Sequence, residues 1–277
     1  MLDLIRLSPR DLFPPGGRDL YRQIALLTDM DQGQEVLVAA CGTGVTAEYF
    51  ADEFGVLVSA VDEDPLLIER AEARTRGKGL GGRVQFQSAS MDALPYRDGV
   101  FDVVVAELGA TASVEPEEAI AELVRVTRPG GHVVLVHLVW KAAVEPERKE
   151  TLARHLGARP LMMVELKRNL RRLGVTNLHS EAWSDDGTAF RADAKKPFPD
   201  FGELFSIPEK VGILRRAWSR WGWRGIQTVF AREREVHRLL TRERILGLDF
   251  VKGTQAQPRP DESSSPPIPE STSEEEP

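Results

Sequence analysis

Hydrophobic residues in the first half of the chain gather in short runs, and segments with helical spacing lie between them. Apolar or alternating runs predict five strands, at residues 36–40, 56–61, 83–88, 101–107 and 132–138. Apolar residues three and four apart predict helices at 19–27 and 45–54, and further helices that begin at Pro65 and Pro116. Because strand and helix alternate, we expect a parallel sheet with helices on both faces.

The periodic signal is weaker after residue 140. It predicts helices at 147–156 and 161–173 and two more strands at 175–183 and 245–253. Between these two strands lie a polar stretch and then a long helix from Glu209 to about Arg244, with a break expected near Gly222 and Gly225. The pattern predicts an α/β fold with a Rossmann-like doubly wound, mostly parallel seven-stranded sheet. This domain would cover residues 1–257, with a helical insertion at about 184–244 between the last two strands.

The end of the chain differs from the rest in composition. Residues 258–277 are rich in Pro, Ser and Glu and carry −5 of the net charge of −7, which leaves −2 for the other residues. Such a segment cannot bury enough apolar surface to offset its ordering entropy, so we expect a disordered acidic tail. The nearly neutral body lacks the basic surface that general nucleic-acid binding requires.

Composition also bears on the compartment. The chain has a single cysteine and no apolar run near the roughly 20 residues that span a bilayer. Its first residues lack the basic region and apolar core of a signal peptide. Together with the absence of any possible internal disulfide, these features favour a cytoplasmic protein.

The strongest local motif is the glycine turn Gly42-Thr43-Gly44. It joins a buried strand to a helix, which is the geometry that presents backbone N–H groups and a helix N-terminus to a bound cofactor. Asp62 ends the next strand, twenty residues after Gly42. A nucleotide-binding βαβ unit places there the carboxylate that accepts the ribose hydroxyls.

Five segments in order resemble the motifs of class I S-adenosylmethionine (SAM)-dependent methyltransferases, in the branch that includes quinone and small-molecule methyltransferases. They are Pro15–Gly17, Val36–Gly44, Val61–Pro65, Leu94–Asp102 and Leu123–Gly131. The resemblance implies SAM as cofactor. The cofactor-binding residues that it implies are Ala40, Cys41, Gly42, Thr43, Gly44, Asp62, Glu63, Ser90, Met91 and Glu107.

Two positions depart from the family pattern. The acid usual in the first motif is Val38 here, and the acid that usually binds the adenine amino group falls on Ser90. The resemblance then leaves Asp62 as the main anionic anchor. Ser90 can still accept a hydrogen bond, and the Met91 backbone can still meet the adenine ring.

Open α/β sheets hold ligands at the carboxyl ends of their strands, and three residues are candidates for that edge. Glu107 follows the fourth strand and could orient the acceptor, accept a proton or bind the SAM amino group; the alternative is a rim residue in solvent. His137 is expected at the same rim after the fifth strand and is a second candidate base. Tyr21 could contact the SAM site from the first helix, or simply pack in the core. We expect a structural role for Asp102.

The insertion carries an apolar stripe made of Val211, Leu214, Trp218 and Trp221, flanked by four arginines. Its place between the last two strands suggests a lid over the acceptor pocket, with Trp218 and Trp221 as substrate-binding residues. Such a stripe can also be ordinary core. A basic amphipathic helix with tryptophans can instead lie on a membrane, which we do not favour.

The sequence therefore predicts an enzyme that transfers a methyl group from SAM to a small or lipophilic acceptor. One alternative is an NAD-dependent oxidoreductase, because Gly42-x-Gly44-x-x-Ala47 also fits the dinucleotide fingerprint. The other is a methyltransferase-like SAM-binding protein without catalysis, suggested by Val38 and Ser90. No metal site is predicted, because the five histidines lack paired ligand spacing.

Overall fold

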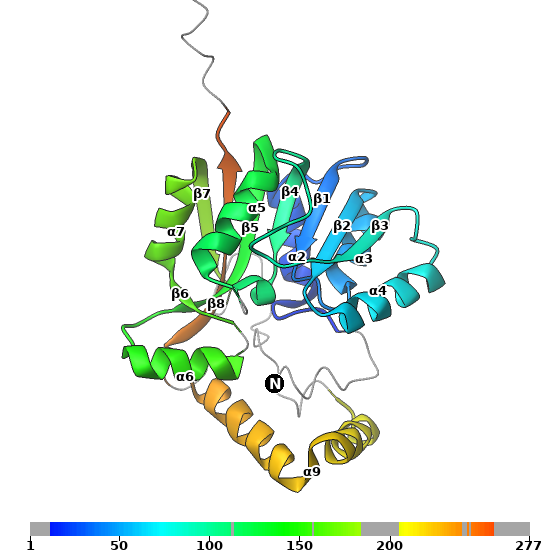
Figure 1. The fold of residues 1–277 in the computed structure, drawn as a ribbon, viewed down its shortest axis with the longest axis vertical. Helices are drawn as coiled ribbons and strands as arrows, with labels where there is room; N and C mark the ends of the chain where they lie inside the picture. Colours follow the sequence, from blue (N-terminus) through cyan, green and yellow to red (C-terminus); the bar gives the residue numbers. More distant parts are fainter. Residues whose placement is uncertain are drawn as a thin grey trace, which may run out of the picture.

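The computed structural model describes residues 12–111, 114–156, 158–183, 205–239, 243 and 245–257. One sheet runs through the domain in the strand order β3-β2-β1-β4-β5-β8-β7, and β6 pairs with β5 outside that path (Figure 1). The strands are β1 Glu35–Ala39, β2 Leu57–Asp62, β3 Val84–Ser88, β4 Phe101–Ala106, β5 Thr127–Trp140, β6 Leu161–Met162, β7 Val175–Ala182 and β8 Leu246–Gln255. The pairs are parallel except those that β8 forms with β5 and β7.

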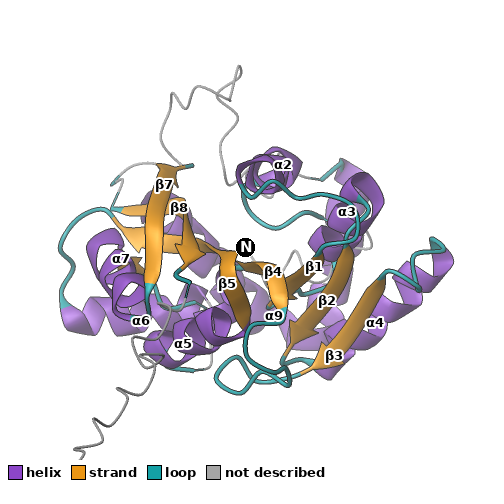
Figure 2. Ribbon diagram, turned by 90° about the horizontal axis from the view of Figure 1, so that it is seen from above, coloured by secondary structure: helices purple, strands orange, loops and turns teal. Residues whose placement is uncertain are grey.

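Helices cover both faces of this sheet, as the alternation of the sequence predicts. The helical elements are α2 Gly17–Leu27, α3 Val45–Phe54, α4 Pro65–Gly77, the 3-10 helix η1 Leu108–Thr111, α5 Pro116–Val126, α6 Pro146–Leu156, α7 Met163–Arg172 and α9 Ile207–His237. Viewed from above, α2 and α3 lie on one side of the sheet and α5 on the other (Figure 2).

Alternate residues of each strand supply the two cores. Val36 and Val38 of β1 pack in the cluster that includes the buried faces of α2 and α3, whereas Leu37 and Ala39 pack in the cluster that includes α5 and α7. A strand that is buried on both faces needs apolar residues at every position, which is why β1 is a continuous apolar run. Val38, which replaces the usual acid, is therefore a core residue.

The Rossmann-like sheet is confirmed, with two local differences from the prediction. The segment expected to be helical from residue 161 begins with the two-residue strand β6, so the sheet has eight strands rather than seven. Strand β5 begins at Thr127, before Pro129-Gly130-Gly131 and not after it, and its register with β4 shifts there. A Cβ on Gly131 would lie 2.8 Å from the Asp102 carbonyl oxygen, so only glycine fits at this shift.

Helix α9 lies between β7 and β8 in the sequence, as expected of the insertion, and begins at Ile207. It breaks at Gly222, which has φ 64° and ψ −176°, and not at Gly225. Its two halves share a small core of their own, made of Phe205, Ile213, Ala217, Ile226 and Val229. The acidic tail and residues 184–204 of the insertion lie outside the described residues. Among the described helices, none is both long and apolar enough to cross a membrane.

Candidate cofactor site

The glycine turn lies between β1 and α3 and leaves space for a ligand. Gly42 and Gly44 have φ of 56° and 74°, and Ala40 before them also has a positive φ of 57°. Around Gly44 the packing is tight, since a Cβ there would lie 2.6 Å from the Phe86 ring. At Gly42 a Cβ would meet nothing within 4 Å. Gly44 is thus needed for close packing of helix on strand, and Gly42 borders open space at the N-terminus of α3.

Asp62 holds this turn against the end of β2. Its Oδ2 accepts a hydrogen bond from the Gly42 backbone N at 2.9 Å, and its Oδ1 accepts one from the Asp64 backbone N at 3.0 Å. Each carboxylate oxygen has a second lone pair, so the side chain can still accept hydrogen bonds from ligand hydroxyls. Asp62 therefore supports the turn and keeps acceptor capacity at the carboxyl edge of the sheet.

Three buried polar side chains meet beside the turn, each from a different element. Glu107 follows β4, Tyr21 comes from α2 and Thr46 from the first turn of α3, and each is less than a tenth exposed. Glu107 Oε1, Tyr21 Oη and Thr46 Oγ1 make no hydrogen bond within the described part of the chain. The Thr46 hydroxyl is close enough to lower the pKa of both Tyr21 and Glu107, so the three oxygens form one cluster and are not three independent unsatisfied groups. A buried polar cluster without a well-formed hydrogen bond indicates a site that a ligand completes.

The electrostatics of these groups follow from their burial. Burial raises the pKa of Glu107 to about 8; the nearby Thr46 hydroxyl opposes this rise and the negative Asp62 adds to it. Burial and the charge of Glu107 raise the pKa of Tyr21 well above its usual value. Burial, with Asp62 and Glu107 nearby, also raises the pKa of the Cys41 thiol, which excludes a thiolate nucleophile there. A cation at this position would lower the free energy of the Glu107 carboxylate.

Ser90 and Met91 follow β3 and so lie at the carboxyl edge of the sheet, as the glycine turn does. The Ser90 hydroxyl contacts the carboxylates of Glu63, at 3.4 Å, and of Asp92. The Met91 side chain is buried in the core, and its backbone N lies 3.5 Å from Glu63 Oε1. An acid absent at Ser90 is thus present two residues later at Asp92, which the sequence motif did not indicate.

Comparison with known proteins accords with this geometry. Residues 37–135 match the family model described as a methyltransferase domain. The chain is 29% identical over 138 residues to methyltransferase GfsG of Streptomyces halstedii, which covers 50% of each protein. It is 32% identical over 144 residues to the ubiquinone/menaquinone biosynthesis C-methyltransferase UbiE of Yersinia pestis, covering 50% of this chain and 56% of the relative. Residues 37–135 thus match a methyltransferase domain, in keeping with the resemblance of the sequence to class I SAM-dependent methyltransferases.

Solved structures show the same fold at lower sequence identity. The [4+2]-cyclase SpnF has a TM-score of 0.67 at 22% identity, covering 91% of this chain and 87% of that one. Phosphoethanolamine N-methyltransferase 2 of Haemonchus contortus, in complex with SAM, has a TM-score of 0.69 at 16% identity, covering 92% and 57%. The chain spans about half the length of the curated relatives that it matches.

Strand order separates this methyltransferase domain from the dinucleotide-binding fold that shares its glycine turn. The dinucleotide fold has the order 3-2-1-4-5-6. Here β8 is inserted between β5 and β7 and runs antiparallel to both. The antiparallel pairing of β8 with β5 and β7 and the match to the methyltransferase family model favour SAM over NAD as the cofactor.

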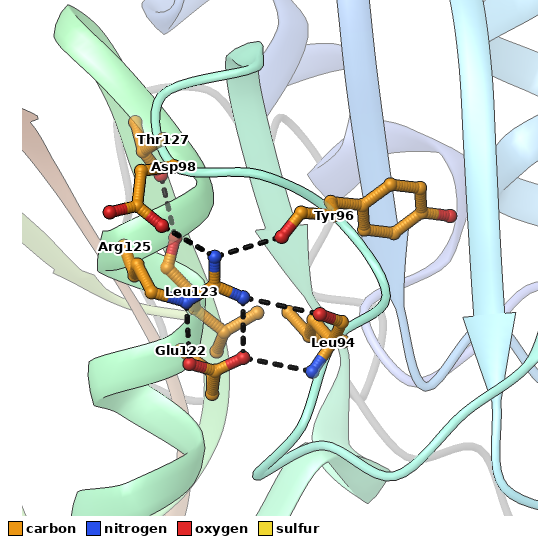
Figure 3. Close-up of polar contacts among 7 residues, drawn as sticks. All are labelled: Leu94, Tyr96, Asp98, Glu122, Leu123, Arg125 and Thr127. Atoms are coloured by element: carbon orange, nitrogen blue, oxygen red, sulfur yellow. Dashed lines mark hydrogen bonds and ion pairs between the residues drawn. The ribbon is translucent and has the colours of Figure 1, made fainter.

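Two motifs of the methyltransferase domain that lie far apart in sequence are joined by Arg125 of α5 (Figure 3). Its guanidinium donates to the backbone oxygens of Leu94 and Tyr96 at 3.1 and 2.8 Å. The same group binds the carboxylates of Asp98 and Glu122 at 2.6–2.7 Å, and Glu122 accepts the Leu94 N–H at 2.8 Å. This network fixes the loop between the Ser90 segment and β4, so residues of both motifs have a structural role.

Asp102 has the structural role expected of it. Its Oδ2 accepts the Glu35 backbone N–H at 2.7 Å, and its carboxylate pairs with Arg128. These contacts tie the start of β4 to the starts of β1 and β5.

His137 is not at the rim beside Glu107, and that expectation is wrong. Because β5 continues to Trp140, His137 lies inside the strand. Its neighbours Leu135 and Val136 pack on opposite faces, which places His137 on the α5 face and Glu107 on the α2 face. Its Nε2 is 3.0 Å from the Arg159 carbonyl oxygen, and burial lowers its pKa to about 4. Of the two bases that the sequence suggested, Glu107 remains a candidate at this edge of the sheet.

The apolar stripe of α9 does not form one buried face, so the alternative that it is ordinary core is wrong, whereas the lid over the acceptor pocket stays a prediction. Ile213 and Ala217 are the buried positions, whereas Val211 and Trp218 are 61% and 58% exposed. The packed face is shifted by one residue, which turns it by about 100° around the helix. Trp221 packs partly against the small core of α9, and the Trp218 ring lies 5.6 Å from that of Trp223. Helix α9 lies beyond the carboxyl ends of the parallel strands (Figure 1).

Proposed function

We propose that the protein transfers the methyl group of SAM to a small or lipophilic acceptor. The observation that carries the proposal is the group of three buried oxygens without hydrogen-bond partners, at Tyr21, Thr46 and Glu107, beside the open turn at Gly42. The match to a methyltransferase domain adds support, and a solved structure with the same fold is a complex with SAM.

The residues at this edge fit the parts of SAM in order. The N-terminal N–H groups of α3 and the Thr46 hydroxyl suit the methionine carboxylate. Glu107 and Tyr21 suit the positively charged amino group, and Asp62 suits the ribose hydroxyls. Ser90, with Glu63 and Asp92, suits the adenine edge. The acid lost at Val38 is replaced in this arrangement by Glu107.

The chemical task of the protein is mainly to position the reactants. Bound SAM supplies a methyl group already activated by its sulfonium. The protein has to align the acceptor atom in line with that methyl group and exclude water, which needs no elaborate catalytic constellation. Glu107 keeps its proton near neutral pH until a cation is bound, since its pKa is about 8. In the alternative role it accepts the proton that a hydroxyl acceptor loses.

A Glu107→Gln variant separates the two roles. If Glu107 binds the amino group, the variant weakens binding of both SAM and its demethylated product by tenfold or more, as expected for a lost charge-assisted hydrogen bond. If Glu107 is the base instead, kcat falls while the affinity for SAM stays unchanged.

A second candidate is a methyltransferase-like protein that does not transfer methyl groups. A structure of this fold with a TM-score of 0.67 is named a [4+2]-cyclase, and a fold supports more than one chemistry. Turnover of radiolabelled methyl groups with a panel of hydroxyl, amine, thiol and activated-carbon acceptors tests the proposal. Stabilisation by SAM but not by NAD, together with label transfer, supports it. Stabilisation by SAM with no label transferred to any class of acceptor would favour the second candidate.

A further inference from the structure

The surface of α9 is unusually apolar for an exposed helix. Trp218 and Trp223 are 58% and 57% exposed, and their rings pack against each other at a centroid distance of 5.6 Å. Ile207 and Val211 on the first half of the helix are exposed as well. Tryptophan prefers the interface between the headgroups and the hydrocarbon of a bilayer, because its ring is apolar and its N–H is polar.

The same segment is strongly basic in an acidic protein. Residues 205–231 contain five basic residues against the single acid Glu209, a charge of +4, whereas the whole chain carries −7. Arg215, Arg220 and Arg224 are exposed and form no ion pair within the described part of the chain. Like charges without partners repel one another, so this surface is complementary to a polyanionic partner.

An apolar groove of about 1120 Å³ runs between the two halves of α9. It is lined by Leu214, Trp218, Trp223, Ile226 and Phe230, with Arg215 and Arg234 among the lining residues. Apolar walls with guanidinium groups beside them match a lipid, whose acyl chain is apolar and whose phosphate is anionic. A nucleic acid would use the arginines and leave the apolar walls in water.

We propose that α9 docks the protein on a bilayer of anionic phospholipid. Trp218 and Trp223 enter the interface, Arg215, Arg220 and Arg224 contact lipid phosphates, and the groove takes up acyl chains. Since α9 lies beyond the carboxyl ends of the parallel strands (Figure 1), docking turns the Glu107 edge of the sheet toward the membrane. The docking does not depend on methyl transfer and is tested without SAM.

Vesicle co-sedimentation of the full chain tests the proposal. We expect binding to phosphatidylcholine vesicles that contain phosphatidylglycerol, and little binding to phosphatidylcholine alone. Raising the salt from about 0.1 M to about 1 M shortens the Debye length from about 10 to about 3 Å and should release most of the protein. No binding to the anionic vesicles at low salt would overturn the proposal.

One double and two single substitutions in α9 locate the contact. Trp218→Ala with Trp223→Ala should weaken vesicle binding about tenfold or more, and each of Arg220→Gln and Arg224→Gln about fivefold. The matched control is Arg168→Gln with Arg172→Gln on α7, another exposed basic helix, which should leave vesicle binding unchanged.

All of these side chains are exposed, so the melting temperatures of the variants should match that of the unmodified chain. Binding that survives the tryptophan changes, or that falls as much in the α7 control, would overturn the proposal. So would equal, tryptophan-independent binding to double-stranded DNA, because the surface would then recognise negative charge alone.

Discussion

Two buried glutamates on the α2 and α3 side of the sheet have opposite surroundings. Glu48 of α3 is 3% exposed and accepts hydrogen bonds from Arg74, Thr75 and Lys78 at 2.6–2.9 Å. Glu107 is 6% exposed, and its Oε1 has no donor within the described part of the chain. Burial would raise the pKa of both; at Glu48 the hydrogen bonds outweigh it and the pKa is lowered, while at Glu107 the pKa rises to about 8.

The difference separates a structural carboxylate from a binding one. Glu48 is satisfied within the protein, where both of its carboxylate oxygens accept hydrogen bonds and join α3 to α4. Glu107 is held in a position that the folded chain alone does not satisfy. A protein retains such a group at a cost in stability where the group has a function, which supports the cofactor-binding role proposed for Glu107.

The largest effect is expected at Glu48. A Glu48→Gln change leaves Arg74 without its carboxylate in a mostly buried position, and removing one partner of a buried pair costs about 3–5 kcal/mol. Urea denaturation at neutral pH measures this loss. SAM affinity of the folded variant should be unchanged. A change below the precision of the measurement would contradict the structural role of Glu48.

A substitution at Glu107 should change the free energy of unfolding in the opposite direction and stabilise the protein in the absence of ligand. Because its pKa is raised in the folded state, the unfolded chain loses this proton first as the pH rises. The free energy of unfolding therefore falls between the ordinary pKa of a glutamate and about pH 8, and then levels off. Glu107→Gln removes that loss, so we expect it to stabilise the protein by about 2–4 kcal/mol at alkaline pH and not below about pH 4. Equal effects at both pH values would show that the carboxyl is not buried as described.

Asp62 should matter for affinity more than for stability. Asp62→Asn keeps an oxygen for the Gly42 N–H, gives up the hydrogen bond from the Asp64 N–H, and removes the charge that strengthens hydrogen bonds to ribose hydroxyls. We expect SAM to bind tenfold or more weakly, corresponding to about 1.5–3 kcal/mol. The matched control is Asp64→Asn, since Asp64 caps α4 and Asn is an equally good cap. Calorimetry should show weaker binding in the first variant only.

Removal of residues 258–277 should have the smallest effect. Their composition offers no core, so melting temperature and SAM affinity should stay the same. A fall of several degrees in melting temperature on truncation would show that the acidic tail packs on the domain.

Local features of the site could be predicted from the sequence, and long-range ones could not. Gly42, Gly44 and Asp62 belong to one βαβ unit, whose geometry depends on neighbouring residues alone. The meeting of Tyr21, Thr46 and Glu107 depends on which face of the sheet each strand presents to α2 and α3. Thr46 had a signal that was missed: it is the second residue of the helix after the turn.

The errors at His137 and α9 have a common cause. Both predictions depended on the position of a residue along its strand or helix, known to within one residue. One residue in a strand reverses the face, and one residue in a helix turns the side chain by about 100°. The extension of β5 past His137 and the packing of Ile213 rather than Leu214 are set by contacts with distant segments, which periodicity does not contain.

The central claim is that Glu107 is the partner of a cation on the bound cofactor. Calorimetry of SAM binding in buffers of different ionisation enthalpy measures the protons exchanged. At about pH 7, Glu107 is mostly protonated before binding and ionised beside the cation afterwards, so about one proton should be released. The release should vanish above about pH 9 and in Glu107→Gln. Proton release of the same size in Glu107→Gln, or none in the unmodified protein at about pH 7, would contradict the claim.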